Sequence, residues 1–249
     1  MNFSGISSKS FLGRLIRLPL RLIPAGMVVP ILQGPLRGQR WITGSGTHGC
    51  WLGSYEYKKQ RVFADAINPG MIVYDVGAHV GFYTMLASCR VGSSGKVIAF
   101  EPLPRNINLL KRHLALNGCG NVSVAEWAVS DRPGLAWFTA NPERSFEGHL
   151  SAGGDFQVQA VTLDDLWSGG KLPIPDVIKI DVEGAEHDAL LGARQLLKAR
   201  HPLIFLATHS VEKHSQCCRL LLNLGYELHS IDERPIDNSD EIVAEYQGK

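Results

Sequence analysis

The 249-residue sequence lacks any uninterrupted run of 18 apolar residues, so no membrane-spanning helix is predicted. It contains only five cysteines and no Cys-x-x-Cys pair, which argues against both a disulfide framework and a zinc ribbon. The N-terminus also lacks the apolar core of a signal peptide, because Arg14, Arg17 and Arg21 interrupt it. With 45% hydrophobic residues and a mean hydropathy of −0.02, the composition is typical of a globular protein, and we expect a cytoplasmic one.

A strong net charge is also lacking: the formal value of +1 excludes a generally basic nucleic-acid-binding protein. The charge is nevertheless unevenly distributed. Residues 1–55 carry +6 because they contain no acid, which leaves −5 for the remaining residues; the six basic residues are Lys9, Arg14, Arg17, Arg21, Arg37 and Arg40. We predict a basic N-terminal extension over residues 1–50, partly an amphipathic helix, and a single domain over residues 51–249.

The arginines of residues 11–23 follow i, i+3, i+7 spacing, so they share one face of a predicted helix. One interpretation is peripheral contact of residues 9–40 with an anionic membrane. The alternative is a helix that docks on the protein's own core and is kinked at Pro19.

From residue 71 onward, apolar runs of strand length alternate with segments of helical periodicity. Strands are predicted over residues 72–76, 96–100, 122–129, 176–182 and 203–208, and helices over 57–67, 81–90, 103–117, 184–199 and 211–224. Such alternation predicts an α/β fold with a mostly parallel sheet covered on both faces. A strand over 134–139 and a terminal antiparallel pair over 226–231 and 241–246 are also predicted, whereas residues 24–49 and 140–155 are expected to be irregular.

The segment Val73-Tyr-Asp-Val-Gly-Ala-His-Val-Gly81 joins a strand to a helix through two glycines. Gly77 permits a sharp turn and close approach of a ligand, and Gly81 opens the helix with free N–H groups. Asp75 lies at the carboxyl end of the strand, where open α/β sheets bind ligands. Glu101 ends the next strand, at the place where a dinucleotide-binding fold holds ribose hydroxyls.

These two features discriminate between cofactors. A pyrophosphate requires Gly-x-Gly-x-x-Gly, but this loop has no central glycine and places Asp75 beside the helix N-terminus. S-adenosylmethionine has no phosphate, and its amino group needs an acceptor such as Asp75. An NAD-binding Rossmann oxidoreductase is therefore the weaker alternative.

A third segment, residues 176–186, places Lys179, Asp181 and Glu183 at alternating positions, so that all three point to one side. They are candidates for positioning or deprotonating an acceptor hydroxyl, and His209, just beyond the next strand, is a candidate general base. A buried structural ion pair is the alternative for the first three. Tyr55 and Glu56 are candidates for substrate binding. No metal site is predicted from His209, His214, Cys217 and Cys218, because vicinal cysteines point to different faces of a helix.

Three segments, residues 75–84, 100–106 and 178–186, together resemble the FkbM-type methyltransferases of the class I superfamily. The resemblance covers roughly residues 51–231. It implies a Rossmann-like three-layer sandwich with a seven-stranded sheet and one antiparallel C-terminal strand, S-adenosylmethionine as methyl donor, and transfer to a hydroxyl of a sugar, glycan or natural product. It implies cofactor binding by Asp75, Gly77, His79, Gly81, Glu101, Pro102, Asn106 and Asp181.

Two positions depart from the family pattern. The family more often has Asn at the position of His79, and often an acid in the strand that here reads Phe-Leu-Ala-Thr-His-Ser, residues 205–210. An RNA-directed class I methyltransferase is the other alternative, but only the first 55 residues offer the basic face that it requires. The acceptor atom, oxygen or nitrogen, and the oligomeric state are left open by the sequence.

Overall fold

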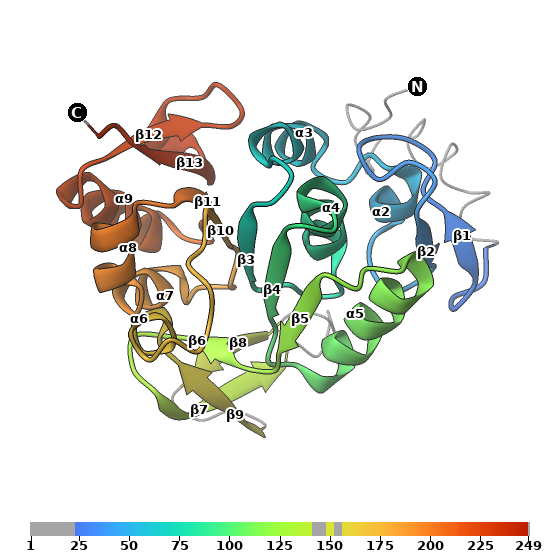
Figure 1. The fold of residues 1–249 in the computed structure, drawn as a ribbon, viewed down its shortest axis with the longest axis horizontal. Coiled ribbons are helices and arrows are strands. Elements are labelled where there is room, and N and C mark those ends of the chain that lie inside the picture. The colour runs from blue at the N-terminus through green and yellow to red at the C-terminus, as the bar shows by residue number, and fades with distance from the viewer. Residues whose placement is uncertain (1–22, 141–147, 152–155, 249) are drawn as a thin grey trace.

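The computed structural model describes residues 23–140, 148–151 and 156–248 (Figure 1). Its centre is a seven-stranded sheet of order β12-β13-β11-β10-β3-β4-β5. The strands are β3 (Ile72–Val76), β4 (Lys96–Phe100), β5 (Val122–Ala125), β10 (Val177–Ile180), β11 (Leu203–Ala207), β12 (Tyr226–Ser230) and β13 (Glu241–Tyr246). β13 runs antiparallel to both of its neighbours, β11 and β12, whereas the strands from β11 to β5 pair in parallel. This is the predicted fold class, which is confirmed down to the single antiparallel strand at the C-terminal end.

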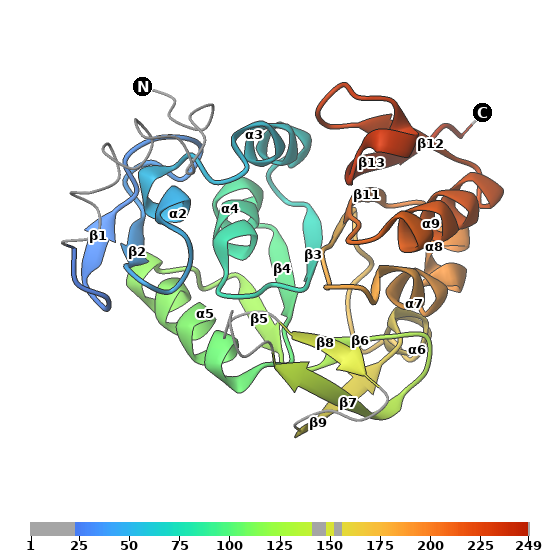
Figure 2. The same ribbon diagram turned by 180° about the vertical axis from the view of Figure 1, so that it is seen from behind.

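Helices cover both faces of this sheet, as Figures 1 and 2 show from opposite sides. One apolar cluster joins one face to α3 (Tyr57–Ala66), α4 (Phe82–Val91) and α5 (Pro104–Asn117). The other joins the opposite face to α6 (Leu163–Ser168), α7 (Glu186–Leu191), α8 (Arg194–Arg200) and α9 (Val211–Asn223). Alternation along the strands divides the core, since Val73 belongs to the first cluster and Tyr74 to the second. The three-layer sandwich is therefore confirmed.

The predicted strand over residues 122–129 is two strands, which was not foreseen. β5 belongs to the main sheet, whereas β6 (Ala128–Val129) belongs to a second sheet of order β6-β9-β7-β8. The other members are β7 (Gly134–Ala140), β8 (Gly148–Ser151) and β9 (Phe156–Val161). The prediction that residues 140–155 are all irregular was wrong, because β8 pairs with β7 inside that range.

The predicted helix over residues 184–199 is also divided, into α7 and α8. The division falls at Gly192, where a β-carbon would lie 1.9 Å from the Ser130 carbonyl oxygen. Asp164 then starts α8, because its carboxylate accepts the backbone N–H groups of Gln195 and Leu196 at 3.0 and 2.8 Å. A cap that comes from another segment leaves no signal in the local sequence pattern. The periodicity of residues 184–199 therefore predicted one continuous helix.

Residues 24–49 were expected to be irregular, but they contain a two-stranded hairpin, β1 (Val28–Pro30) with β2 (Arg40–Ile42), and the start of α2 (His48–Leu52). Trp41 is fully buried, and its ring stacks on His113 of α5 at 4.0 Å. The described part of the predicted extension therefore contributes to the core, and the boundary at residue 50 remains a prediction. The predicted amphipathic helix over residues 11–23 lies outside the described residues, except for its last one.

Candidate active site

Glu101 follows β4 directly and ties together two loops at the carboxyl edge of the sheet. Its Oε2 accepts the backbone N–H of His79 at 2.8 Å. Its Oε1 accepts the Leu103 N–H at 3.0 Å and the Asn106 amide at 3.2 Å. Burial raises the pKa of this carboxyl group, and the three donors partly oppose that effect. The predicted cofactor residues Glu101 and Pro102, on the β4–α5 connection, are thus adjacent to Asn106 in the first turn of α5.

The loop between β3 and α4 adopts left-handed backbone at three positions: Gly77 (φ 79°), His79 (φ 53°) and Gly81 (φ 95°). A β-carbon at Gly77 would lie 1.9 Å from the Asp181 carbonyl oxygen, so glycine permits the approach of another backbone segment rather than that of a ligand alone. Asn, Asp and His tolerate the left-handed region better than other side chains. His79, at a position where the family more often has Asn, therefore permits the same backbone conformation of the loop.

Asp75 and Lys179 are neighbours on adjacent parallel strands, and the sheet register brings them together. Both side chains are buried, with Lys179 Nζ 3.1 Å from Asp75 Oδ1 and 3.2 Å from the Gly77 carbonyl oxygen. The Thr84 hydroxyl donates to Asp75 Oδ2 at 2.6 Å. These contacts fit the buried ion-pair alternative, and a direct cofactor contact for Asp75 remains a prediction.

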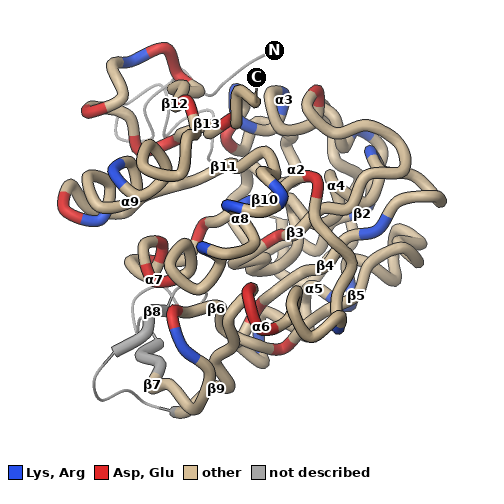
Figure 3. Tube along the Cα trace, turned by 60° about the vertical axis from the view of Figure 1, so that its left-hand side comes forward, with Lys and Arg blue, Asp and Glu red and all other residues tan. Residues whose placement is uncertain are grey.

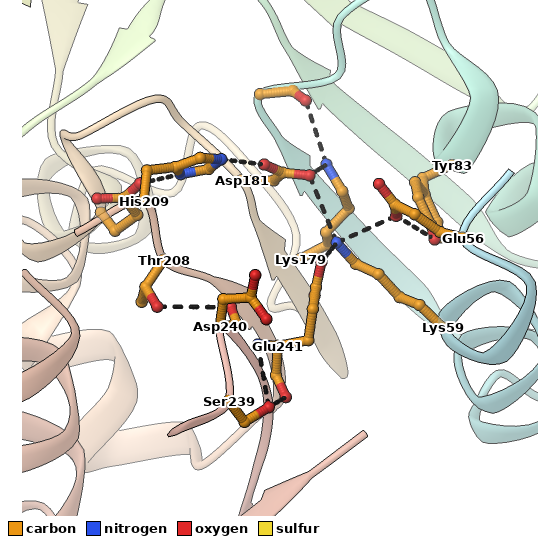
Figure 4. Close-up of polar contacts among 12 residues, drawn as sticks. Glu56, Lys59, Tyr83, Lys179, Asp181, Thr208, His209, Ser239, Asp240 and Glu241 are labelled. Atoms are coloured by element: carbon orange, nitrogen blue, oxygen red, sulfur yellow. Dashed lines mark hydrogen bonds and ion pairs between the residues drawn. The ribbon is translucent and has the colours of Figure 1, made fainter. Parts of the chain in front are cut away.

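Asp181, Glu183 and His209 meet where β10 and β11 end, and Figure 4 shows Asp181 and His209 there. His209 Nε2 lies 3.6 Å from Asp181 Oδ1 and 3.6 Å from Glu183 Oε2. Burial alone would raise the pKa of Asp181, but the neighbouring lysines and the imidazole hold it well below its usual range. The candidate catalytic residues predicted from two separate segments are therefore brought together at one edge.

Glu186 holds the other nitrogen of His209 and was not predicted to belong to the site. Its buried carboxylate oxygen Oε1 lies 2.5 Å from His209 Nδ1. The hydrogen bond with Glu186 is the main cause that raises the pKa of His209 to about 9; burial opposes it, and Asp181 and Glu183 add to it. This contact orients the ring so that Nε2 faces Asp181 and Glu183.

Replacing Glu186 by Gln is expected to bring the pKa of His209 back toward its ordinary value of about 6.5. A raised folded-state pKa adds stability that is complete below about pH 6.5 and is lost as the pH rises through about 9. Glu186→Gln should reduce this pH dependence. Imidazole NMR titration and thermal unfolding at pH 6 and pH 9 measure both effects. Glu212→Gln, on the exposed start of α9, is the control, and an equal His209 pKa in both variants would contradict the assignment.

Buried Lys59 and Tyr83 and half-buried Glu56 and Glu241 form a polar group beside Asp181 (Figure 4). Lys59 Nζ lies 2.7 Å from Glu241 Oε1, 3.3 Å from Glu56 Oε2 and 3.5 Å from Asp181 Oδ2. The Tyr83 hydroxyl donates to Glu56 Oε2 at 2.7 Å. Of these residues, only Glu56 was predicted for the site. It and Tyr55 border the group, but their contact with substrate remains a prediction.

Cysteine and histidine side chains also meet on α9, beside Thr208 at the end of β11. His214 accepts or donates a hydrogen bond with Thr208 at 3.1 Å and contacts Cys218 Sγ at 3.4 Å. Within the described ranges, no group of three or more His, Cys, Asp or Glu side chains is arranged to hold a metal ion. The cations beside Asp181 are the ammonium groups of Lys59 and Lys179 and, when protonated, the imidazole of His209.

Comparison with known proteins identifies the family. The model of the methyltransferase FkbM domain matches residues 75–228. A hexuronic acid methyltransferase, AglP, from Haloferax volcanii is 28% identical over 140 residues, which cover 56% of each chain. The chain thus spans about half the length of this curated relative.

Solved structures agree on the fold. The methyltransferase FkbM of Methylobacillus flagellatus has a TM-score of 0.52 at 16% identity, with 81% of this chain and 56% of that chain covered. An O-methyltransferase of Thermotoga maritima has a TM-score of 0.52 at 14% identity, with 93% and 81% covered. Since the family model spans more than half of the sequence, the chain belongs to the FkbM family of S-adenosylmethionine-dependent methyltransferases, as its three segments predicted.

Proposed function

We propose that this chain is an enzyme that transfers a methyl group from S-adenosylmethionine to a hydroxyl of a sugar, a glycan or another small natural product. One observation carries the proposal: Glu101, Asp181 and His209 lie at the same carboxyl edge of the sheet, at the ends of β4, β10 and β11. This edge is where α/β sheets bind ligands. The family membership of the chain agrees with that reaction class.

The residues of the edge fit the proposed cofactor. A carboxylate accepts about four hydrogen bonds, and three donors already contact Glu101, so one position is left for a ribose hydroxyl. The acids around Asp181 also outnumber the cations: Glu56, Asp75, Glu183, Glu186 and Glu241 join it, against Lys59, Lys179 and His209. An acidic surplus suits a sulfonium with an amino group and disfavours a pyrophosphate.

When bound, S-adenosylmethionine supplies an electrophilic methyl group whose leaving thioether is neutral. The protein must therefore orient the acceptor and remove one proton. The acceptor hydroxyl donates its hydrogen bond to His209 Nε2, which takes the proton as the oxygen–methyl bond forms, and Asp181 Oδ1 orients the acceptor by accepting a hydrogen bond from a second hydroxyl. Glu186 keeps the ring in place and stabilises the resulting imidazolium. Because the pKa of His209 is about 9, kcat/KM should increase with pH up to that value.

The acceptor class is tested by following tritium from labelled S-adenosylmethionine into a panel of neutral sugars, hexuronic acids and glycan extracts. The hexuronic acid relative makes sugars the first acceptors to examine. Labelled sugar methyl ether is the expected product. Label in RNA would favour the RNA alternative. That alternative is not favoured, and Figure 3 shows the Lys and Arg residues of the described trace scattered among Asp and Glu.

A second proposal concerns residues 23–40, which present apolar and basic side chains to solvent. Met27, Val28 and Leu32 are 47%, 47% and 53% exposed, and Arg37 and Arg40 are exposed beside them. We propose that this region contacts an anionic membrane surface peripherally. None of the described helices is long and apolar enough to cross a bilayer. A cytoplasmic location remains part of this proposal.

Arg37→Ala with Arg40→Ala is expected to weaken binding of the full chain to anionic vesicles about tenfold or more, since each basic residue contributes about 1 kcal/mol at such a surface. Co-sedimentation with phosphatidylcholine vesicles, with and without phosphatidylglycerol, measures the effect. Lys198→Ala, an exposed change on α8, is the matched control. Equal binding of the wild type to neutral and anionic vesicles would refute membrane contact.

A further inference from the structure

Lys59 is a buried lysine that joins three separate segments of the chain (Figure 4). It comes from α3, and its Nζ contacts Glu56 before that helix, Asp181 after β10 and Glu241 on β13. Its side chain is 4% exposed, so these ionic contacts are largely shielded from water. Lys59 and Glu241 both lie outside residues 75–228, the part that matches the family model.

The two lysines of the site act on the same oxygen of Asp181. Lys59 Nζ lies 3.5 Å and Lys179 Nζ lies 3.6 Å from Asp181 Oδ2. The other oxygen, Oδ1, is the one that faces His209 at 3.6 Å. Lys179 is also engaged by Asp75 and by the Gly77 carbonyl oxygen, so it belongs to the sheet, whereas Lys59 approaches Asp181 from the helical layer. Together the two ammonium groups fix which oxygen remains for the acceptor.

A purely structural role for Lys59 does not explain why it contacts Asp181. Buried ion pairs often contribute little net stability compared with apolar residues of similar size. Asp181 keeps 22% of its side chain exposed at the reacting edge, whereas Asp75 is fully buried. Lys59 therefore acts on a carboxylate that is within reach of a ligand, not only on groups of the core.

We propose that Lys59 is a positioning residue for methyl transfer: it holds Asp181 ionised and turned so that Oδ1 faces His209 and the acceptor, and Glu241 anchors Lys59 in that place. The inference rests on the proposed role of Asp181. Lys59 does not touch the reacting atoms. It acts through the charge and the orientation of one carboxylate, which directly follows β10 and lies within the segment that matches the family model.

The test compares Glu241→Gln with the double variant Lys59→Met/Glu241→Gln in the full chain. Lys59→Met alone would leave the half-buried carboxylates of Glu56 and Glu241 without this counter-charge and would destabilise the protein. The Glu241→Gln background removes one of them, so the comparison isolates Lys59. Lys58→Met is the matched control, because Lys58 is the exposed neighbour on the same helix, with 62% of its side chain exposed. Carboxyl-detected NMR titration measures the pKa of Asp181, and calorimetry measures S-adenosylmethionine binding.

We expect the pKa of Asp181 to be about one to two pH units higher in the double variant than in Glu241→Gln, since an adjacent cation lowers a carboxyl pKa by about that amount. Lys58→Met should leave it unchanged. Equal values in the wild type, Glu241→Gln and the double variant would overturn the proposal, whereas a value already raised in Glu241→Gln would show that Glu241 holds Lys59 in place. A second measurement uses the wild type and needs no substitution. The NMR resonance of the Lys59 ammonium group should shift as Asp181 is protonated. A resonance that does not respond would also overturn the proposal. If the wild type fails to bind S-adenosylmethionine, the proposed function falls, independently of the comparison between variants.

Discussion

His209→Gln is expected to lower kcat/KM for methyl transfer about 10²–10⁴-fold, the usual contribution of a positioned general base. Gln keeps a polar group of similar reach but cannot take a proton at neutral pH. The variant should also lose the rise in kcat/KM toward pH 9 that the raised pKa of His209 gives the wild type. The tritium-transfer assay measures both effects at saturating cofactor.

His229→Gln is the control for this prediction, because His229 is about half exposed on β12 and contacts Glu227, not Asp181. A His209→Gln variant with more than about a tenth of the wild-type kcat/KM would contradict the assignment of His209 as the base. In that case Asp181 or Glu183 would be the next candidates. Asp181 is ionised throughout the neutral range, so a flat pH profile would favour it.

Gly77→Ala is expected to destabilise the protein by about 2–5 kcal/mol, from left-handed backbone strain and from overpacking. The new β-carbon would lie 1.9 Å from the Asp181 carbonyl oxygen and 3.0 Å from Val182. For a domain of this size, the expected decrease in Tm is about 5–15 °C. Thermal and urea unfolding measure the change.

Gly118→Ala separates the two causes. Gly118 ends α5 with φ 64°, and nothing lies within 4 Å of a β-carbon there, so only the backbone strain of about 1 kcal/mol is expected. The difference between the two variants measures how tightly the Gly77 loop packs on the end of β10. Equal destabilisation of both would show that this contact is looser than the structure has it.

The sequence predicts the sheet well where each strand is bounded by its own signals. The predicted strands over residues 72–76 and 96–100 match β3 and β4 in full, because apolar runs with β-branched residues are followed by a glycine turn or by Pro102. The position of Glu101 in the site is predicted by the same signals, because it depends on where the strand over residues 96–100 ends. Its three hydrogen-bond donors lie within 22 residues of it.

The parts that the sequence does not predict depend on contacts between distant segments. Lys59 is one of two adjacent lysines on an amphipathic helix, and nothing local distinguishes it from exposed Lys58. Its partners Asp181 and Glu241 are 122 and 182 residues away along the chain. Glu186 is likewise an ordinary acid of a first helical turn until the fold places His209 beside it. Gly192 is itself a local signal, a glycine inside a helical pattern, but the carboxylate that starts α8 comes from Asp164 on a distant segment.

Calorimetric titration of the full chain with S-adenosylmethionine tests the central claim most directly, because it needs no knowledge of the acceptor. We predict saturable one-site binding by the wild type and a loss of about 100-fold or more in Glu101→Ala, where ribose contacts made by a buried carboxylate are removed. Glu126→Ala, an exposed acid paired with Lys111, should bind as the wild type does. No binding by the wild type, or unchanged affinity in Glu101→Ala, would contradict the account.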